Sequence, residues 1–242
     1  MDCKLYYDTL GKTGISEREL NRFEKTMPYV LKKGTLCDVG CGEGYWLEYL
    51  NQNTELTLFG TDISTERLKQ AKENSKIRIM NADIRNLPFK DNEIEQITAM
   101  EILEHIPDWK KGLEELIRVA SKRIIITIPY NEKLKYEICP KCGERAYLYG
   151  HMHSFKEKDF KSLDIDKIEF FKFPGGAKVS YYIKKLLNIK KGQIHTNTQR
   201  TICPQCYTNI PYSLKRKFER GFRRINKILE KSPEYLVIKI DK

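Results

Sequence analysis

Short apolar runs alternate with one-sided apolar stripes along the first half of the chain. Strand-like runs are predicted at 35–39, 56–62, 77–80, 94–99 and 123–128, with helical segments between them. The first helix is predicted behind Ser16, because serine is a favourable N-cap residue and Leu20, Phe23 and Met27 follow at helical spacing. This βαβα alternation is typical of a doubly wound, mostly parallel α/β sheet with a Rossmann-like arrangement.

The second half is less regular. Its predicted elements are a helix at 155–163, a sixth strand at 167–173, a basic helix at 214–231 and a last strand at 235–240. A chain of 242 residues suits one globular domain with insertions. We divide it into an N-terminal helical cap, 1–34, and a main domain, 35–242, with insertions at 131–150 and 174–212.

A glycine cluster follows the first predicted strand, in the run Asp38-Val39-Gly40-Cys41-Gly42-Glu43-Gly44. Glycines between a strand and a helix let the backbone approach a ligand, because no Cβ stands in the way. The spacing is G-x-G-x-G, whereas dinucleotide enzymes usually have G-x-G-x-x-G. By itself this pattern is also compatible with a plain strand-to-helix turn.

Three further elements follow the ends of later strands. Asp62 closes the second strand, where an acid can accept hydrogen bonds from both ribose hydroxyls. Asp83 follows the third strand and can accept from an adenine amine, while Ile63 and Ile84 can sandwich the ring. The fourth strand runs into Met100-Glu101-Ile102-Leu103-Glu104-His105-Ile106-Pro107. Open α/β sheets bind ligands at this carboxyl edge, so we expect a nucleoside-containing cofactor there.

Together these segments resemble the class I S-adenosylmethionine-dependent methyltransferases, within the type 11 group related to the ubiquinone and menaquinone biosynthesis methyltransferases. The resemblance covers roughly residues 34–130. It implies a seven-stranded sheet whose last strand is antiparallel. The implied cofactor contacts are Gly40, Cys41 and Gly42 at the methionine moiety, Asp62 at the ribose, Asp83 at the adenine and Met100 near the sulfonium, with Asp38 acting indirectly. An N-terminal segment, Tyr6-Tyr7-Asp8, is expected to close over the cofactor.

Four of the seven cysteines form two C-P-x-C pairs, Cys139 with Cys142 and Cys203 with Cys206. Two such pairs can supply the four thiolates of a structural zinc site. Disulfides and thioredoxin-like redox motifs are alternatives. A reducing cytosol disfavours disulfides. A redox motif is disfavoured because neither pair opens a helix after a strand. If strands five and six are both parallel members of the sheet, one zinc ion would pin the two insertions together beside the acceptor pocket.

Three histidines are candidates for the acceptor side of the site. His151 and His153 follow the first cysteine pair and could supply a general base or hold an anionic acceptor. They could also ligate zinc, or lead into a helix capped by Ser154. His105 lies just after the fourth strand. From this position it could face the acceptor pocket or simply pack in the core.

Charge divides the chain unevenly. Residues 35–130 carry 12 basic and 16 acidic side chains, whereas residues 131–242 carry 25 basic and 12 acidic ones. The basic helix at 214–231 could be a solvated face, or could meet phosphates on a lipid-linked glycan, a membrane surface or RNA. Aromatic residues are not interleaved in it, so RNA is the weaker choice. In combining two cysteine pairs with a late basic helix, the chain resembles methyltransferases that act in glycan and cell-surface polysaccharide assembly.

We therefore expect methyl transfer from S-adenosylmethionine to a small-molecule or glycan acceptor, at oxygen. The alternatives are an RNA or protein methyltransferase and a non-catalytic scaffold that binds the cofactor. No apolar run approaches the ~20 residues of a membrane span, and no secretory signal opens the sequence, so a cytoplasmic location is expected.

Overall fold

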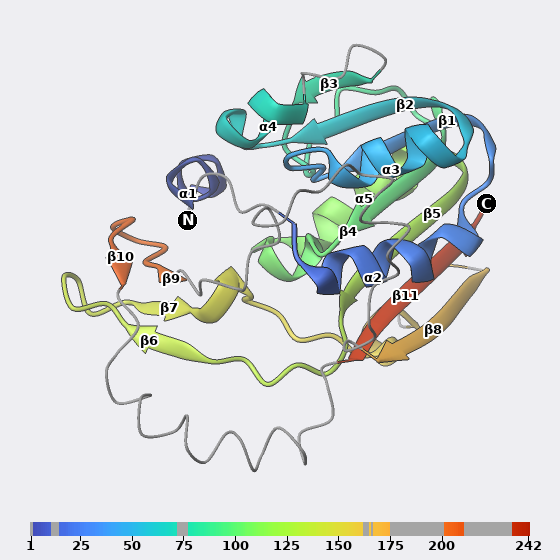
Figure 1. Ribbon diagram of the computed structural model, residues 1–242. Coiled ribbons are helices and arrows are strands. Elements are labelled where there is room, and N and C mark those ends of the chain that lie inside the picture. Colours follow the sequence, from blue (N-terminus) through green and yellow to red (C-terminus); the bar gives the residue numbers. More distant parts are fainter. Residues whose placement is uncertain are drawn as a thin grey trace.

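A computed structural model of the chain describes residues 2–10, 15–71, 77–161, 165, 167–174, 201–210 and 234–242. Seven strands form one sheet in the order β3-β2-β1-β4-β5-β11-β8 (Figure 1). Their bounds are β1 Lys33–Val39, β2 Glu55–Asp62, β3 Arg78–Asn81, β4 Ile94–Met100, β5 Ala120–Pro129, β8 Ile168–Pro174 and β11 Glu234–Asp241. The predicted fold class and all seven predicted strands are confirmed.

Strand β11 is the antiparallel member of the sheet. It lies between β5 and β8 and runs opposite to both, with Tyr235 beside Pro129 on one side and Phe173 on the other. Strands β1, β2, β3, β4 and β5 pair in parallel, so their carboxyl ends meet at one edge. Because β8 is antiparallel to β11, its carboxyl end also lies at this edge. The loops after β1, β2, β3, β4 and β5 are therefore available to build one site.

Helices cover both faces of the sheet, and the strand pleat sends alternate side chains to each face. In β1, Leu36 belongs to the core beneath α2 (Glu17–Thr26), α3 (Tyr45–Asn53) and α4 (Thr65–Ala71). The next residue, Cys37, belongs to the core beneath α5 (Trp109–Val119) and α6 (Glu157–Lys161). The strands are apolar almost throughout because both of their faces are buried.

Helix α2 begins where the sequence predicts. The Ser16 hydroxyl accepts from the backbone N–H of Glu19 at 3.2 Å, and the Glu19 carboxylate accepts from the N–H of Ser16 at 2.7 Å. This reciprocal capping box satisfies two N–H groups at the start of the helix. The helix ends at Thr26, and a 3-10 turn containing Pro28 leads on to β1.

Two of the predicted helical segments differ from the structure. No helix joins β3 to β4: residues 82–93, all described, form turns, one of them closed by a bridge between Asp83 and Asn86. Pro88, in the middle of this connection, disfavours a helix there because it lacks a backbone N–H and restricts the residue before it. The helix predicted after the fourth strand also starts later than expected. His105 lies in a short 3-10 turn, Leu103–His105, and α5 begins at Trp109. The predicted basic helix at 214–231 lies outside the described residues.

The two cysteine pairs lie at the tips of small hairpins beside the sheet (Figure 1). Strands β6 (Tyr136–Ile138) and β7 (Arg145–Tyr147) flank the first pair, and β9 (Thr201–Ile202) and β10 (Asn209–Ile210) flank the second. Helix α1 (Cys3–Leu10) lies between these hairpins and α4. Among the described residues, no helix is long and apolar enough to span a bilayer.

Candidate active site

The glycine turn after β1 requires left-handed backbone at three positions. Gly40, Gly42 and Gly44 have φ angles of 79°, 53° and 81°. The N–H groups of Gly40 and Cys41 both donate to the carbonyl of Thr61, at 2.7 and 2.9 Å. A Cβ on Gly40 would stand 2.3 Å from the Ile102 side chain. Side chains are excluded here for two reasons, backbone strain and lack of space.

Asp62 holds this turn from the end of β2. One carboxylate oxygen accepts from the N–H of Gly42 at 2.8 Å, and the other accepts from the N–H of Ser64 at 2.8 Å. The residue is 6 % exposed and lines a pocket at the carboxyl edge of the sheet. Each oxygen keeps a lone pair for a ligand, so the acid is fixed in place and still able to bind hydroxyl groups.

Asp38 lies behind this pocket and is absent from its wall. Its carboxylate accepts from the Thr98 hydroxyl at 2.7 Å. Burial raises the pKa of Asp38 to about 7, and the charge of Asp62 adds to the effect. The position fits the indirect role expected from the sequence.

Ile63, Asp83 and Ile84 also line the pocket. The Asp83 carboxylate pairs with the Arg85 guanidinium, whose Nη2 lies 2.5 Å from Oδ2. Burial opposes ionisation of Asp83, but the hydrogen bonds from Arg85 outweigh it and hold the pKa below its ordinary value. An ionised acid in the same pocket as two isoleucines can accept from an adenine amine while the isoleucines contact the ring.

Helix α1 contributes Tyr7 to the pocket wall. Its ring meets the His105 ring edge to face, with centroids 5.9 Å apart. On the same helix, Asp8 accepts from the Ser64 hydroxyl at 2.8 Å and from the N–H of Glu66 at 3.3 Å. Asp8 thus satisfies a donor in the first turn of α4, which holds α1 over the pocket.

A buried polar cluster adjoins the pocket at the end of β4. It contains Glu104, His105 and His151, whose ligand atoms all lie within 4.8 Å of one another. Burial and the neighbouring Glu101 charge raise the pKa of Glu104 well above its usual range. Burial and the adjacent His151 hold the pKa of His105 well below its usual value. Glu101 and His105 themselves line the pocket, so this cluster opens toward the cofactor site.

His151 and His153, two residues apart, point to different partners. His151 lies beside His105, with ring centroids 4.7 Å apart. His153 Nε2 lies 2.9 Å from the carbonyl oxygen of Ile106. The structure therefore brings His105 and His151 together and leaves His153 outside the cluster.

Three other candidates lie outside the pocket wall. Met100, Cys41 and Gly42 are not among its lining residues, and Met100 packs instead against the core beneath α2 and α3. The wall at the end of β4 is made by Glu101 and Ile102, because a backbone φ of 55° at Glu101 turns the chain there. The sequence analysis did not name Glu101 and Glu104 as site residues. The available signal was two acidic residues just after the end of the fourth strand.

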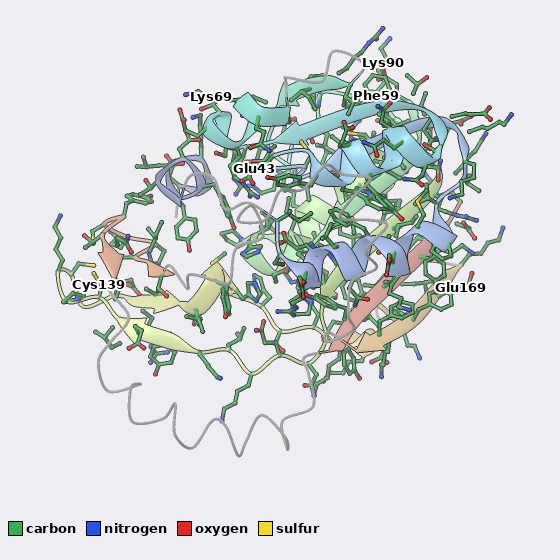
Figure 2. The ribbon with its side chains drawn as sticks, in the orientation of Figure 1. Glu43, Phe59, Lys69, Lys90, Cys139 and Glu169 are labelled. Carbon is green, nitrogen blue, oxygen red and sulfur yellow. The ribbon has the colours of Figure 1, made fainter. Side chains whose placement is uncertain are left out.

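The four paired cysteines converge as predicted. Their Sγ atoms lie within 4.8 Å of one another, with 3.6 Å between Cys139 and Cys206 and 3.4 Å between Cys142 and Cys203. Zinc–sulfur bonds of about 2.3 Å place tetrahedral thiolates about 3.8 Å apart, so these residues fit a zinc ion. Figure 2 shows Cys139 at the end of its hairpin farthest from β8 and β11.

Helix α1 connects the cysteine cluster to the pocket. The N–H of Asp2 donates to the hydroxyl of Tyr207, in the second cysteine loop, at 3.1 Å. Tyr6 is buried against Gly150, which belongs to the first insertion. A Cβ added to Gly150 would stand 2.8 Å from the hydroxyl oxygen of Tyr6. One helix thus contacts both insertions and the pocket.

Comparisons with known proteins agree with this geometry. Residues 37–126 match the family described as a methyltransferase domain. The chain is 35 % identical over 162 residues to a demethylmenaquinone methyltransferase of Staphylococcus saprophyticus, covering 62 % of this chain and 66 % of that protein. It is 29 % identical over 136 residues to the chloroplastic tocopherol O-methyltransferase of Arabidopsis thaliana, covering 48 % and 38 %.

A solved structure extends the similarity to nearly the whole chain. A SAM-dependent methyltransferase from Archaeoglobus fulgidus matches with a TM-score of 0.56 at 18 % identity, over 93 % of this chain and 94 % of that one. The chain spans only 38 % to 66 % of the length of the two curated relatives. Residues 37–126 thus match a methyltransferase domain, and the chain around them has the fold of a solved SAM-dependent methyltransferase.

Proposed function

We propose that this protein transfers a methyl group from S-adenosylmethionine to a small-molecule acceptor, at an oxygen atom. The observation that carries the proposal is the pocket at the carboxyl edge, where the glycine turn, Asp62 and Asp83 converge. Asp62 would bind the ribose hydroxyls and Asp83 the adenine amine, with Ile63 and Ile84 against the ring. The curated relatives are named for a quinone-type acceptor and for tocopherol, which supports a small molecule.

The cofactor supplies the activated methyl group, and the protein supplies alignment. Holding donor and acceptor in line contributes much of the rate of such transfers. The polar cluster of Glu104, His105 and His151, next to Glu101, adjoins the pocket and is where we place the acceptor. Glu101 is held by Arg22 of α2, whose guanidinium nitrogen lies 3.6 Å from Glu101 Oε2. A polar acceptor group would meet unpaired oxygen and nitrogen atoms there.

We also propose that the four cysteines bind a structural zinc ion, in a reducing compartment such as the cytoplasm. Cys139 and Cys203 are buried, and no disulfide joins any described pair. The site would fasten the two insertions to each other beneath α1. A more specific form of the proposal is a glycan or lipid-linked acceptor that binds to the basic segment at 214–231. This segment lies outside the described residues.

Asp62 provides the first test. In Asp62→Asn the binding of S-adenosylmethionine and S-adenosylhomocysteine should weaken roughly 10- to 150-fold, because each charge-assisted hydrogen bond contributes about 1.5–3 kcal/mol. Calorimetric titration of both ligands measures the loss. Asparagine keeps the shape of the side chain and one acceptor oxygen, so one of the N–H groups of Gly42 and Ser64 loses its acceptor, whereas Asp62→Ala would release both.

Glu48→Gln, at a half-buried position of α3, is a control that should bind both ligands like the wild type, since Glu48 is absent from the pocket wall. Wild-type protein that binds neither ligand would refute the proposed function. Cofactor binding without methyl transfer to any acceptor would favour the alternative of a non-catalytic scaffold. Tight, salt-sensitive RNA binding would favour an RNA methyltransferase.

A further inference from the structure

The polar cluster beside the pocket contains a buried carboxylate with no partner. Glu104 is 0 % exposed, and neither of its carboxylate oxygens has a hydrogen-bond partner. Nδ1 of His105 is also unpaired, and Nε2 of His105 lies 3.9 Å from Glu104 Oε1. Burying an acid in this way is costly unless a ligand supplies the missing interactions. The cluster is therefore organised to receive a group that carries positive charge or donates hydrogen bonds.

His151 is oriented for coordination by a residue behind it. Its Nδ1 atom lies 2.5 Å from the Glu132 carboxylate. When Nδ1–H donates to that carboxylate, the Nε2 lone pair remains free for another bond. Histidines that bind metals are commonly held in this way, with a carboxylate fixing the tautomer and the ring orientation.

The backbone fixes the other two donors. The N–H groups of Met152 and His153 both donate to the carbonyl of Glu104, at 2.8 and 3.3 Å. These bonds join the loop after β4 to the segment after the first cysteine pair, and they place His151 beside His105. Three candidate ligands from two distant segments are thus held together by hydrogen bonds that need no ion.

We propose that Glu104, His105 and His151 bind a divalent cation of the first transition row at the edge of the methyl-donor pocket. Two imidazoles and one carboxylate suit Mn²⁺, Fe²⁺, Co²⁺ or Zn²⁺, whereas Mg²⁺ and Ca²⁺ prefer oxygen ligands alone. Bonds of about 2.0–2.2 Å require donors roughly 3–4.4 Å apart, so the ion would draw the cluster slightly inward.

The site is chemically distinct from the four cysteines. Thiolates select soft or borderline ions such as zinc, and Mn²⁺ binds them poorly. Three protein ligands also leave coordination positions open, as catalytic metal sites do. Because His105 lines the pocket, an open position can face the acceptor.

The role of the ion rests on the proposed function. An acceptor hydroxyl bound to the ion would lose its proton to bulk water more readily than a free hydroxyl. Its oxygen would then form the new bond to the methyl carbon. The sulfur–methyl bond would break with its electron pair remaining on sulfur, leaving S-adenosylhomocysteine. The ion itself would be neither oxidised nor reduced.

Manganese titration tests the binding without any donor or acceptor. The full chain, carrying zinc and freed of loosely bound ions, should bind one Mn²⁺, seen as loss of the free-ion signal in electron paramagnetic resonance. Glu104→Gln and His151→Gln should each weaken this binding at least about tenfold, the lower end of losses seen when a residue supporting a metal is changed. His153→Gln is the matched control and should keep it, because His153 contacts the Ile106 carbonyl instead.

Thermal unfolding guards against a variant that simply fails to fold. Without added metal, Glu104→Gln should be about as stable as the wild type, since a neutral amide of the same shape replaces a buried acid that has no hydrogen-bond partner. Added Mn²⁺ should raise the melting temperature of the wild type and not that of Glu104→Gln. No Mn²⁺ binding, or equal binding in wild type and Glu104→Gln, would overturn the proposal.

Cofactor binding separates this proposal from the previous one. Glu104→Gln should bind S-adenosylhomocysteine within about threefold of the wild type, a difference under 1 kcal/mol. If the wild type binds Mn²⁺ but neither cofactor form, the metal site stands and methyl transfer fails. If it binds the cofactor but no Mn²⁺, methyl transfer stands and the metal site is rejected.

Discussion

Replacing Gly40 with alanine is expected to reduce the affinity for S-adenosylmethionine by more than 100-fold, equivalent to about 2.7 kcal/mol. Gly40 has a φ of 79°, and its new methyl group would stand 2.3 Å from Cδ1 of Ile102. Both residues line the pocket, so any movement that relieves the clash also changes the pocket wall. The left-handed backbone adds about 1–2 kcal/mol of strain to the folded state.

Gly34→Ala is the matched control for this substitution. Gly34 also has a positive φ, 101°, but it lies at the other end of β1, where a Cβ would meet only the flexible carboxylate of Glu95. This variant should therefore lose stability to backbone strain and keep its affinity for the cofactor. Calorimetry and thermal unfolding of both variants separate the two effects. Equal affinities in Gly40→Ala and Gly34→Ala would contradict the place assigned to the glycine turn.

The sequence predicted the central sheet well because the sheet is buried on both faces. Ile124, Ile125 and Ile126 are fully buried and alternate between two cores, so a continuous apolar run was a reliable signal of a strand. The glycine turn and Asp62 were equally readable, since their partners come from adjacent strands. The Asp62 carboxylate meets the N–H of Gly42, which the pairing of β1 with β2 brings close.

The acceptor side was harder to predict, because its contacts span distant parts of the chain. His151 meets His105 only after the backbone bonds between Glu104 and residues 152 and 153 form. From their two-residue spacing, His151 and His153 were equal candidates for the acceptor side of the site. In the structure they contact different partners, His105 and the Ile106 carbonyl. The end of β4 was hard to predict for a local reason: the backbone is left-handed at Glu101, and no glycine marks that turn. Glu101 and Ile102 line the pocket, whereas a contact of Met100 with the cofactor stays a prediction.

Removing one zinc ligand is expected to have the largest effect on the insertions. Cys203 is fully buried in a small core with Cys139, Ala146 and Ile210, separate from the two cores of the sheet. So little apolar surface cannot hold two short hairpins together, so zinc binding would supply most of their folding free energy, as it does in small zinc domains. Cys203→Ser should lose the zinc ion of the four cysteines, measured by elemental analysis as one zinc fewer per chain than in the wild type, whereas Cys37→Ser, in the sheet core, should retain it.

Hydrogen exchange then shows how far the loss extends. The bonds from Cys139 to Glu144 and from Cys203 to Thr208 close the two cysteine loops, and their amides should exchange at least tenfold faster in Cys203→Ser. Amides of β1 and β4 should keep their protection, because the two cores of the sheet do not include the four paired cysteines. The decisive amide is that of Tyr6 in α1, since α1 contacts Tyr207 as well as the pocket. Faster exchange there would mean that zinc secures the cover of the cofactor pocket, whereas unchanged exchange would reduce the cysteine cluster to an independent module.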